Sequence, residues 1–62
     1  MLISAKEIRV GDTIGHPNTQ NDFQYWKVLS VIPIGCTDNI RIQLKGIGWI
    51  FADREREFEL KT

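Results

Sequence analysis

The chain has 62 residues, which is room for one domain, and its eight basic residues are balanced by eight acidic ones. This neutrality argues against a dedicated DNA-binding protein, which usually carries a strong basic excess. Cys36 is the one cysteine and His16 the one histidine, so neither an internal disulfide nor a Cys-based zinc site can be assembled.

The remaining composition points to a small protein of the cytoplasm. No apolar run reaches the roughly 20 residues of a membrane-spanning helix, and no cofactor or metal is expected. A domain this small hides only about 60% of the surface that its unfolded chain exposes. Because such domains are often stabilised by association, a homo-oligomer stays open.

The first residues predict one helical turn. Ser4 followed by Glu7 has the spacing of a capping box, and Ile3 with Ile8 has that of a hydrophobic staple. Since the turn dipeptide at residues 11–12 follows almost at once, residues 4–7 are expected to form a short turn that plugs one end of a barrel. The first strand is then expected to start at residue 13.

The next segment, residues 15–22, has no large apolar side chain and is rich in residues that favour turns. It is predicted to be the longest polar loop. Its polar side chains His16, Asn18 and Gln20 are candidate contacts for a partner.

Residues 23–32 form the longest apolar-rich run and predict the central strand. Trp26 and Val28 are expected on one face, and Tyr25 and Lys27 on the other. The alternation slips by one residue within Leu29-Ser30-Val31, which predicts a β-bulge and a sharp bend.

The second half of the chain predicts three more strands separated by turns. Residues 40–45 alternate strictly, with Ile40, Ile42 and Leu44 inward. Residues 47–52 and 56–60 follow, after turns at residue 46 and at residues 53–55. Together with the segments at residues 13–14 and 23–32, this gives an all-β domain with five strands.

The pattern resembles the SH3-like small barrels, the group that includes Tudor, KOW and Sm-type domains. The resemblance lies in the entry at residues 10–14 (Val-Gly-Asp-Thr-Ile), the bent strand from Trp26 to Val31 and the strand at residues 40–44. It covers nearly the whole chain and implies a five-stranded SH3-like barrel with one short N-terminal helical turn. The acidic loop and paired aromatics of proline-peptide-binding SH3 domains have no counterpart here, so the resemblance implies no activity.

An enzyme is the least favoured class. A Cys36–His16 pair would require the loops at residues 15–22 and 33–39 to share one end of the barrel, together with an orienting group and an oxyanion site. The segment Gly46-Ile47-Gly48 lacks the length and the lysine of a phosphate-binding loop.

Six aromatic residues offer a better signal. Trp26, Trp49 and Phe58 are expected to fill the core, because tiny barrels need bulky interior residues, which would leave Tyr25 or Phe51 outside; a surface position for either Trp stays open as the alternative. Tyr25 is balanced between a core and a surface position, and an exposed aromatic beside a groove is a common anchor for a peptide or a base.

Two functions follow as hypotheses. The first is a non-enzymatic protein-interaction module, such as a regulatory or phage-type accessory protein, that binds another protein through residues 15–22 and the adjacent aromatic-bearing sheet face. The alternative is a single-stranded nucleic-acid-binding barrel that uses basic side chains interleaved with an aromatic one. Both place the contact on one sheet face, formed by Tyr25, Lys27, Arg41, Gln43 and Lys45.

Overall fold

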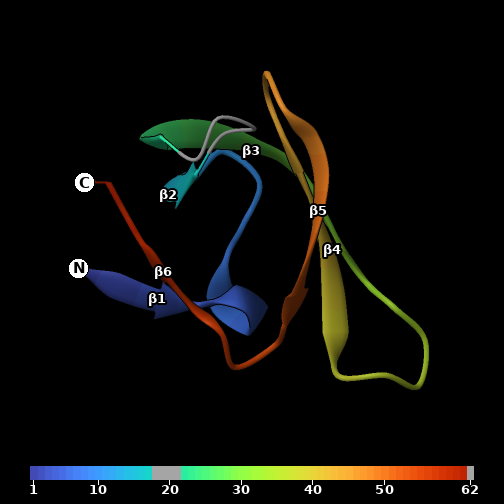
Figure 1. Cartoon of the computed structure of the whole chain (residues 1–62). Helices are drawn as coiled ribbons and strands as arrows, with labels where there is room; N and C mark the ends of the chain where they lie inside the picture. Colours follow the sequence, from blue (N-terminus) through green and yellow to red (C-terminus); the bar gives the residue numbers. More distant parts are fainter. Residues whose placement is uncertain (18–21, 62) are drawn as a thin grey trace.

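Antiparallel strands make up most of this computed structural model, which describes residues 1–17 and 22–61 (Figure 1). The elements are β1 (Leu2–Ser4), a 3₁₀ turn η1 (Ala5–Glu7), β2 (Thr13–Pro17), β3 (Phe23–Pro33), β4 (Asn39–Leu44), β5 (Gly48–Asp53) and β6 (Glu57–Glu59). The all-β prediction is confirmed. Within the described ranges, no helix is long and apolar enough to cross a membrane.

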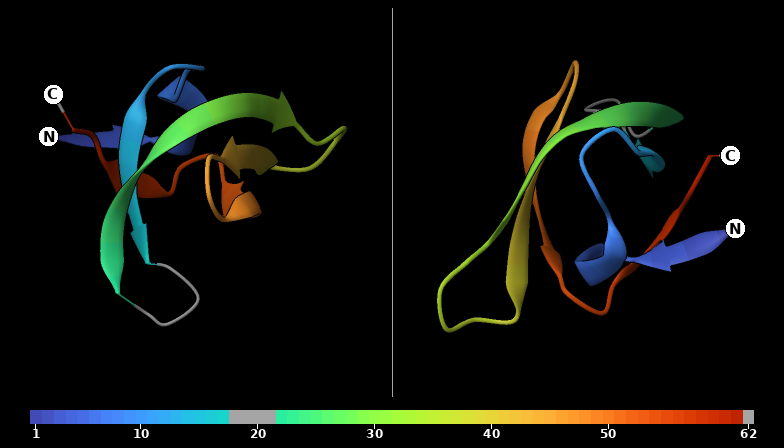
Figure 2. Two further views of the ribbon diagram at one scale, coloured as in Figure 1. Left: turned by 90° about the horizontal axis from the view of Figure 1, so that it is seen from above. Right: turned by 180° about the vertical axis from the view of Figure 1, so that it is seen from behind.

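The strands form two sheets that curl around one interior. β2, β3, β4 and β5 are neighbours in that order, and β1 pairs with β6 (Figure 2). A single bridge between Ile14 and Leu60 joins the two sheets. The four-stranded sheet is a half-barrel, and β1 is a strand that the sequence did not predict.

The predicted bulge in the central strand is confirmed. Val28 lies opposite Leu44, but the next paired residue is Ser30, opposite Gln43, so Leu29 is extra. Residues 23–27 of β3 pair with β2, whereas Val28 and residues 30–33 pair with β4. One bent strand therefore serves both halves of the curled sheet.

The expected polar loop begins later than predicted. Gly15, His16 and Pro17 continue β2, where they lie opposite Tyr25, Gln24 and Phe23. The prediction of a loop at these three positions is wrong, because hydrogen bonding to a long partner strand outweighs their low strand propensity. The candidate contacts Asn18 and Gln20 lie outside the described residues.

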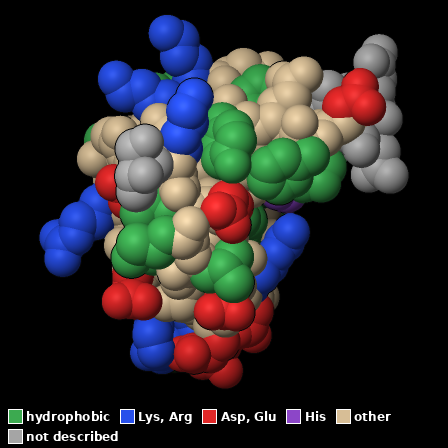
Figure 3. All heavy atoms as spheres, turned by 90° about the vertical axis from the view of Figure 1, so that its left-hand side faces the viewer, with side chains coloured by type: hydrophobic (Ala, Val, Ile, Leu, Met, Phe, Trp, Pro, Cys, Tyr) green, Lys and Arg blue, Asp and Glu red, His purple; other side chains and the backbone are tan. Residues whose placement is uncertain are grey.

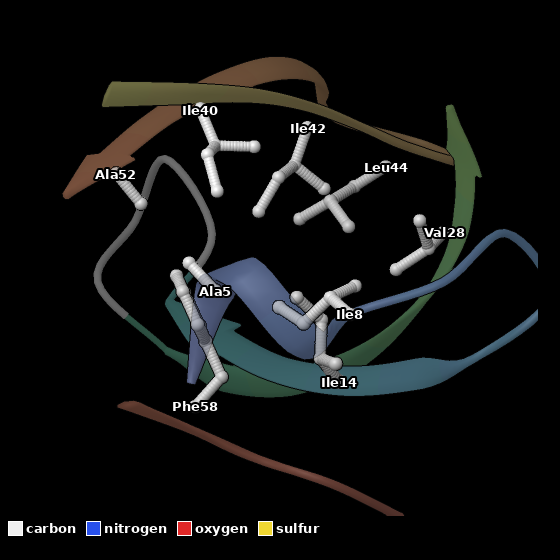
Figure 4. Packing of buried hydrophobic residues seen from close by; sticks show 9 residues of the cluster. All are labelled: Ala5, Ile8, Ile14, Val28, Ile40, Ile42, Leu44, Ala52 and Phe58. Atoms are coloured by element: carbon white, nitrogen blue, oxygen red, sulfur yellow. The ribbon is translucent and has the colours of Figure 1, made fainter. Parts of the chain in front are cut away.

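The core lies between the inner face of the four-stranded sheet and the side chains of η1 and β6 that face it (Figure 4). Its buried side chains are Ala5, Ile8, Ile14, Val28, Ile40, Ile42, Leu44, Ala52 and Phe58. The inward alternation predicted for residues 40–44 is confirmed. Every strand of the half-barrel contributes a fully or nearly fully buried aliphatic side chain, which in β3 is Val28, just before the bulge.

The two tryptophans take different positions. Trp26 is half-buried and packs against the core, and its Nε1 donates a hydrogen bond to the His16 backbone oxygen at 2.8 Å. Trp49 is 38% exposed, so the prediction that it fills the core is wrong. The alternation of β5 turns Ile50 and Ala52 inward, which leaves Trp49 and Phe51 on the outer face.

The predicted helical turn is present, but its capping box is not. The Ser4 hydroxyl donates to the Glu7 carboxylate at 2.8 Å, and no side chain caps the backbone. The Ala5 amide instead donates to the Arg56 backbone oxygen at 2.8 Å. Since a neighbouring segment satisfies the first amide of the turn, the Ser4 side chain is left to bond the carboxylate.

Candidate interaction surface

A groove opens where the first part of β3 meets β2 and the β1–β6 pair. Its volume is about 540 Å³, and it is lined by apolar side chains and three charged ones. The apolar wall consists of Leu2, Pro17, Phe23, Tyr25 and Phe58, and the charged residues are Arg56, Glu57 and Glu59. On the molecular face shown in Figure 3, hydrophobic side chains gather near the centre and Asp and Glu side chains lie below them.

Two exposed aromatic rings form one side of this groove. Phe23 is 58% exposed and Tyr25 is 43% exposed, and their rings meet edge to face with centroids 5.5 Å apart. The Phe23 ring lies directly over the α-carbon of Gly15, where any Cβ would collide with it. Gly15 is thus the residue that allows the end of the Phe23 ring to approach β2 closely.

Tyr25 was a predicted contact, and the structure places it on the surface. Sequence reasoning missed Phe23 and Leu2. Phe23 could have been found, because it precedes Tyr25 by two residues in one strand and must share its face. Leu2 gave no such signal, since nothing in the sequence paired residues 2–4 with residues 57–59.

His16 lies beneath the groove and faces the interior. Its ring centroid is 6.2 Å from that of Phe58, and its buried Nδ1 has no hydrogen-bond partner among the described residues. Burial, and to a smaller extent the Arg56 guanidinium, lowers the pKa of His16 below its usual 6.5. The side chain is therefore neutral at pH 7 and is half-buried, unlike the exposed loop contact that the sequence predicted.

Charged groups border the aromatic wall. The Arg56 guanidinium lies 4.8 Å from the centre of the Phe58 ring, and the Lys61 ammonium lies 5.4 Å from that of Tyr25. The N-terminal ammonium pairs with the Glu59 carboxylate at 3.0 Å. These contacts hold the border of the groove in place with cations over aromatic faces.

The other predicted contacts lie along the outer face of β3 and β4. Lys27 and Lys45 are neighbours, because the Lys45 amide donates to the Lys27 backbone oxygen at 2.9 Å. Gln43 lies opposite Ser30, farther along the sheet. Tyr25 pairs with β2 and lies beyond the end of β4, so the predicted set is spread over a curved surface.

The basic surface differs from the predicted one at two positions: Arg41 lies apart from the lysines, and Lys61 lies near them. The Arg41 guanidinium stacks 4.1 Å above the Trp49 ring, away from Lys27 of β3 and from Lys45, which directly follows β4. Lys61, which the sequence did not suggest, donates its amide to the Thr13 backbone oxygen at 2.9 Å, and Thr13 lies opposite Lys27. Lys61, Lys27 and Lys45 thus follow one another across the sheet, with Thr13 of β2 between Lys61 and Lys27, and are here named the lysine row.

The Cys36–His16 pair, which the sequence left as a disfavoured possibility, is not brought together. His16 is on β2 beside the start of β3, whereas Cys36 follows the end of β3, an 11-residue strand. At roughly 3.3 Å per residue the two positions are far apart. Cys36 is an exposed free thiol. Among residues 1–17 and 22–61, no three His, Cys, Asp or Glu side chains are grouped to hold a metal ion.

Comparisons with protein-family models, with curated proteins and with solved structures each give no match. The chemistry of the surface is therefore what bears on function.

Proposed function

We propose that this chain is a non-enzymatic protein-interaction module of the cytoplasm, built on an SH3-like small barrel. Its binding site is the groove between β2, β3 and the β1–β6 pair. The observation that carries the proposal is the pair of exposed rings, Phe23 and Tyr25, on the wall of an apolar hollow.

The chemistry of the groove favours an extended segment with an apolar side chain. Exposed apolar patches on small proteins often mark interaction sites, and aromatic anchors in pockets supply much of the binding free energy at interfaces. Because Gly15 and the neighbouring ring already hold Phe23 in place, little side-chain entropy is lost when a ligand covers it. Such a site suits an apolar peptide segment of a partner protein.

The test is capture of a partner from nuclease-treated native lysate. The Phe23→Ala variant should lose the captured protein, because it removes one wall of the groove. Phe51→Ala is the matched control, since Phe51 is 62% exposed on β5 and lies outside the groove. Capture that survives Phe23→Ala, or that disappears with Phe51→Ala alone, would contradict the groove as the site.

Gly15→Ala gives a second, independent variant. The new methyl group would push the Phe23 ring out of its place without removing it. Capture should weaken although the aromatic side chain is still present. Unchanged capture, with the fold intact by NMR, would show that the orientation of Phe23 has no role.

Single-stranded nucleic acid is the second candidate, and the lysine row favours it. Lys61, Lys27 and Lys45 line up across the sheet, and Lys61 lies over Tyr25, which could stack with a base. Each phosphate contact contributes roughly 0.7 to the slope of log affinity against log salt, so three contacts give about two. Since the chain has no net charge to attract a polyanion, binding should be weak.

A titration with a labelled oligonucleotide at low and moderate salt separates the two candidates. If nucleic acid is the ligand, changing the three lysines to Glu should abolish binding and leave the fold intact. An apolar peptide segment should bind almost independently of salt. No binding of the parent at low salt would remove the nucleic-acid candidate.

A further inference from the structure

β5 is the last strand of the curled sheet. Among residues 1–17 and 22–61 it has β4 as its one strand neighbour, and no backbone hydrogen bond reaches residues 48–52 from the other side. Bonds to Asp38 and Lys6 start only at Arg54, beyond the strand. The six-residue strand thus presents an open edge of unpaired backbone donors and acceptors.

The side chains along this edge do little to protect it. Natural edge strands are usually blunted by lysine, proline, a bulge or a covering segment. Residues 48–53 contain no lysine and no proline, and their one charge is Asp53 at the end. Phe51 is 62% exposed and Trp49 38% exposed on the outer face, while Ile50 is half-buried on the inner face.

The edge is complementary to itself. If two copies of β5 pair antiparallel about a two-fold axis at Ile50, Trp49 of each copy lies opposite Phe51 of the other, and the two Ile50 residues meet. A parallel, in-register pairing would instead place the Asp53 carboxylates of the two copies side by side, where like charges repel.

We propose that two copies of this chain associate through their β5 edges and form a continuous antiparallel sheet across a two-fold axis. Symmetric, self-complementary contacts are the commonest way in which protein chains pair. The zero net charge of the chain removes long-range repulsion between copies. A strand-edge contact is smaller than a standard interface, so the dimer forms at high protein concentration.

The experiment is sedimentation velocity over a series of protein concentrations. Hydrogen exchange of the β5 amides is measured by NMR at the lowest and at the highest concentration. The parent should shift from monomer to dimer as concentration rises, and the edge amides of β5 should become protected. Phe51→Lys, an exposed change on the edge, should stay monomeric at every concentration and keep the parent's melting temperature. Phe23→Lys, in the groove, is the control and should dimerise like the parent.

An introduced charge pair tests the register. Trp49→Glu should weaken the dimer, and Trp49→Glu combined with Phe51→Lys should restore it, because residue 49 of each copy lies opposite residue 51 of the other. A parent that stays monomeric at NMR concentrations, or a dimer indifferent to Phe51→Lys, would overturn the proposal. Because the groove and the β5 edge are tested by different phenylalanines, either proposal can fail while the other stands.

Discussion

The two halves of β3 look alike in sequence but do different things. Residues 23–27 pair with β2 and expose Phe23 and Tyr25, which form a groove wall. Residues 30–33 pair with β4 and expose Ile32 on an open outer face opposite Arg41. The bulge at Leu29 divides the strand into a half that builds a hollow and a half that extends a sheet.

The inner faces of the two halves also differ. After the bulge, β3 is paired with β4, whose Ile40, Ile42 and Leu44 are almost fully buried. Before it, Val28 is fully buried, but the largest inward side chain is Trp26, which is only half-buried and donates a hydrogen bond to β2. A half that exposes most of its side chains for binding keeps fewer contacts for its own stability.

The largest effect is therefore expected from Trp26→Ala, which should lower the free energy of unfolding by about 3 kcal/mol, at the low end for a large aromatic residue because the ring is half-buried. The variant loses the ring over Gly46 and the bond to β2. Urea denaturation followed by circular dichroism measures the loss.

Trp26→Phe separates the two contributions. It keeps an aromatic ring and removes the hydrogen bond to the His16 backbone oxygen, so a loss of about 1 kcal/mol is expected. If Trp26→Ala unfolds at the same urea concentration as the parent, the stability of the first half of β3 does not depend on this residue. That result would contradict the proposed difference between the two halves.

A smaller effect, dependent on pH, is expected from His16 below the groove. Its pKa in the folded protein lies below 6.5, mainly because of burial. The unfolded chain therefore binds more protons at mildly acidic pH, and stability should fall as pH drops below about 6.5, towards the folded pKa. Above that pH the contribution of His16 should be constant.

His16→Phe is the variant that isolates this effect, because it cannot take up a proton and can still pack near Phe58. Denaturation midpoints should be compared at pH values from about 7 to about 5, above the range in which carboxylates titrate. The parent should lose stability over this range more than the variant. Equal slopes would mean that His16 is as solvated in the fold as in the unfolded chain.

Sequence periodicity predicted those features that depend on local backbone geometry alone. The strict alternation of residues 40–44 and the slip at Leu29 each describe a local backbone geometry, and both are present. The pairing of β1 with β6 could not be predicted, since it joins the ends of the chain and neither segment alternates for long. Trp49 was placed inside because size was weighed above parity: Ile50 and Ala52 fix the inner face of β5.

The candidate site was predictable to a lesser extent. Tyr25 was weighed evenly between core and surface, and Lys27 and Lys45 were expected outside, but the groove depends on Leu2 and Phe58, which come from distant segments. The loop contacts were chosen for polarity alone, and His16 turned inward because β2 continues through it. Whether such a side chain faces the interior or the solvent depends on its position along a strand, which its polarity does not reveal.

The smallest effect on the free energy of unfolding is expected at Ser4. This residue lies outside both halves of β3, so its substitution is a reference for the substitutions within β3. A true N-cap would lose about 1 kcal/mol on replacement by alanine. The Ser4 hydroxyl instead bonds an exposed Glu7 carboxylate, and the backbone of the turn is bonded to residues 54–56. Ser4→Ala should therefore change the free energy of unfolding by less than about 0.5 kcal/mol, as for most surface substitutions. Glu7→Gln, which keeps a hydrogen-bond acceptor, is the matched control and should behave alike. A loss near that of a capping residue, measured by urea denaturation, would show that the hydroxyl bonds the backbone of the turn in solution.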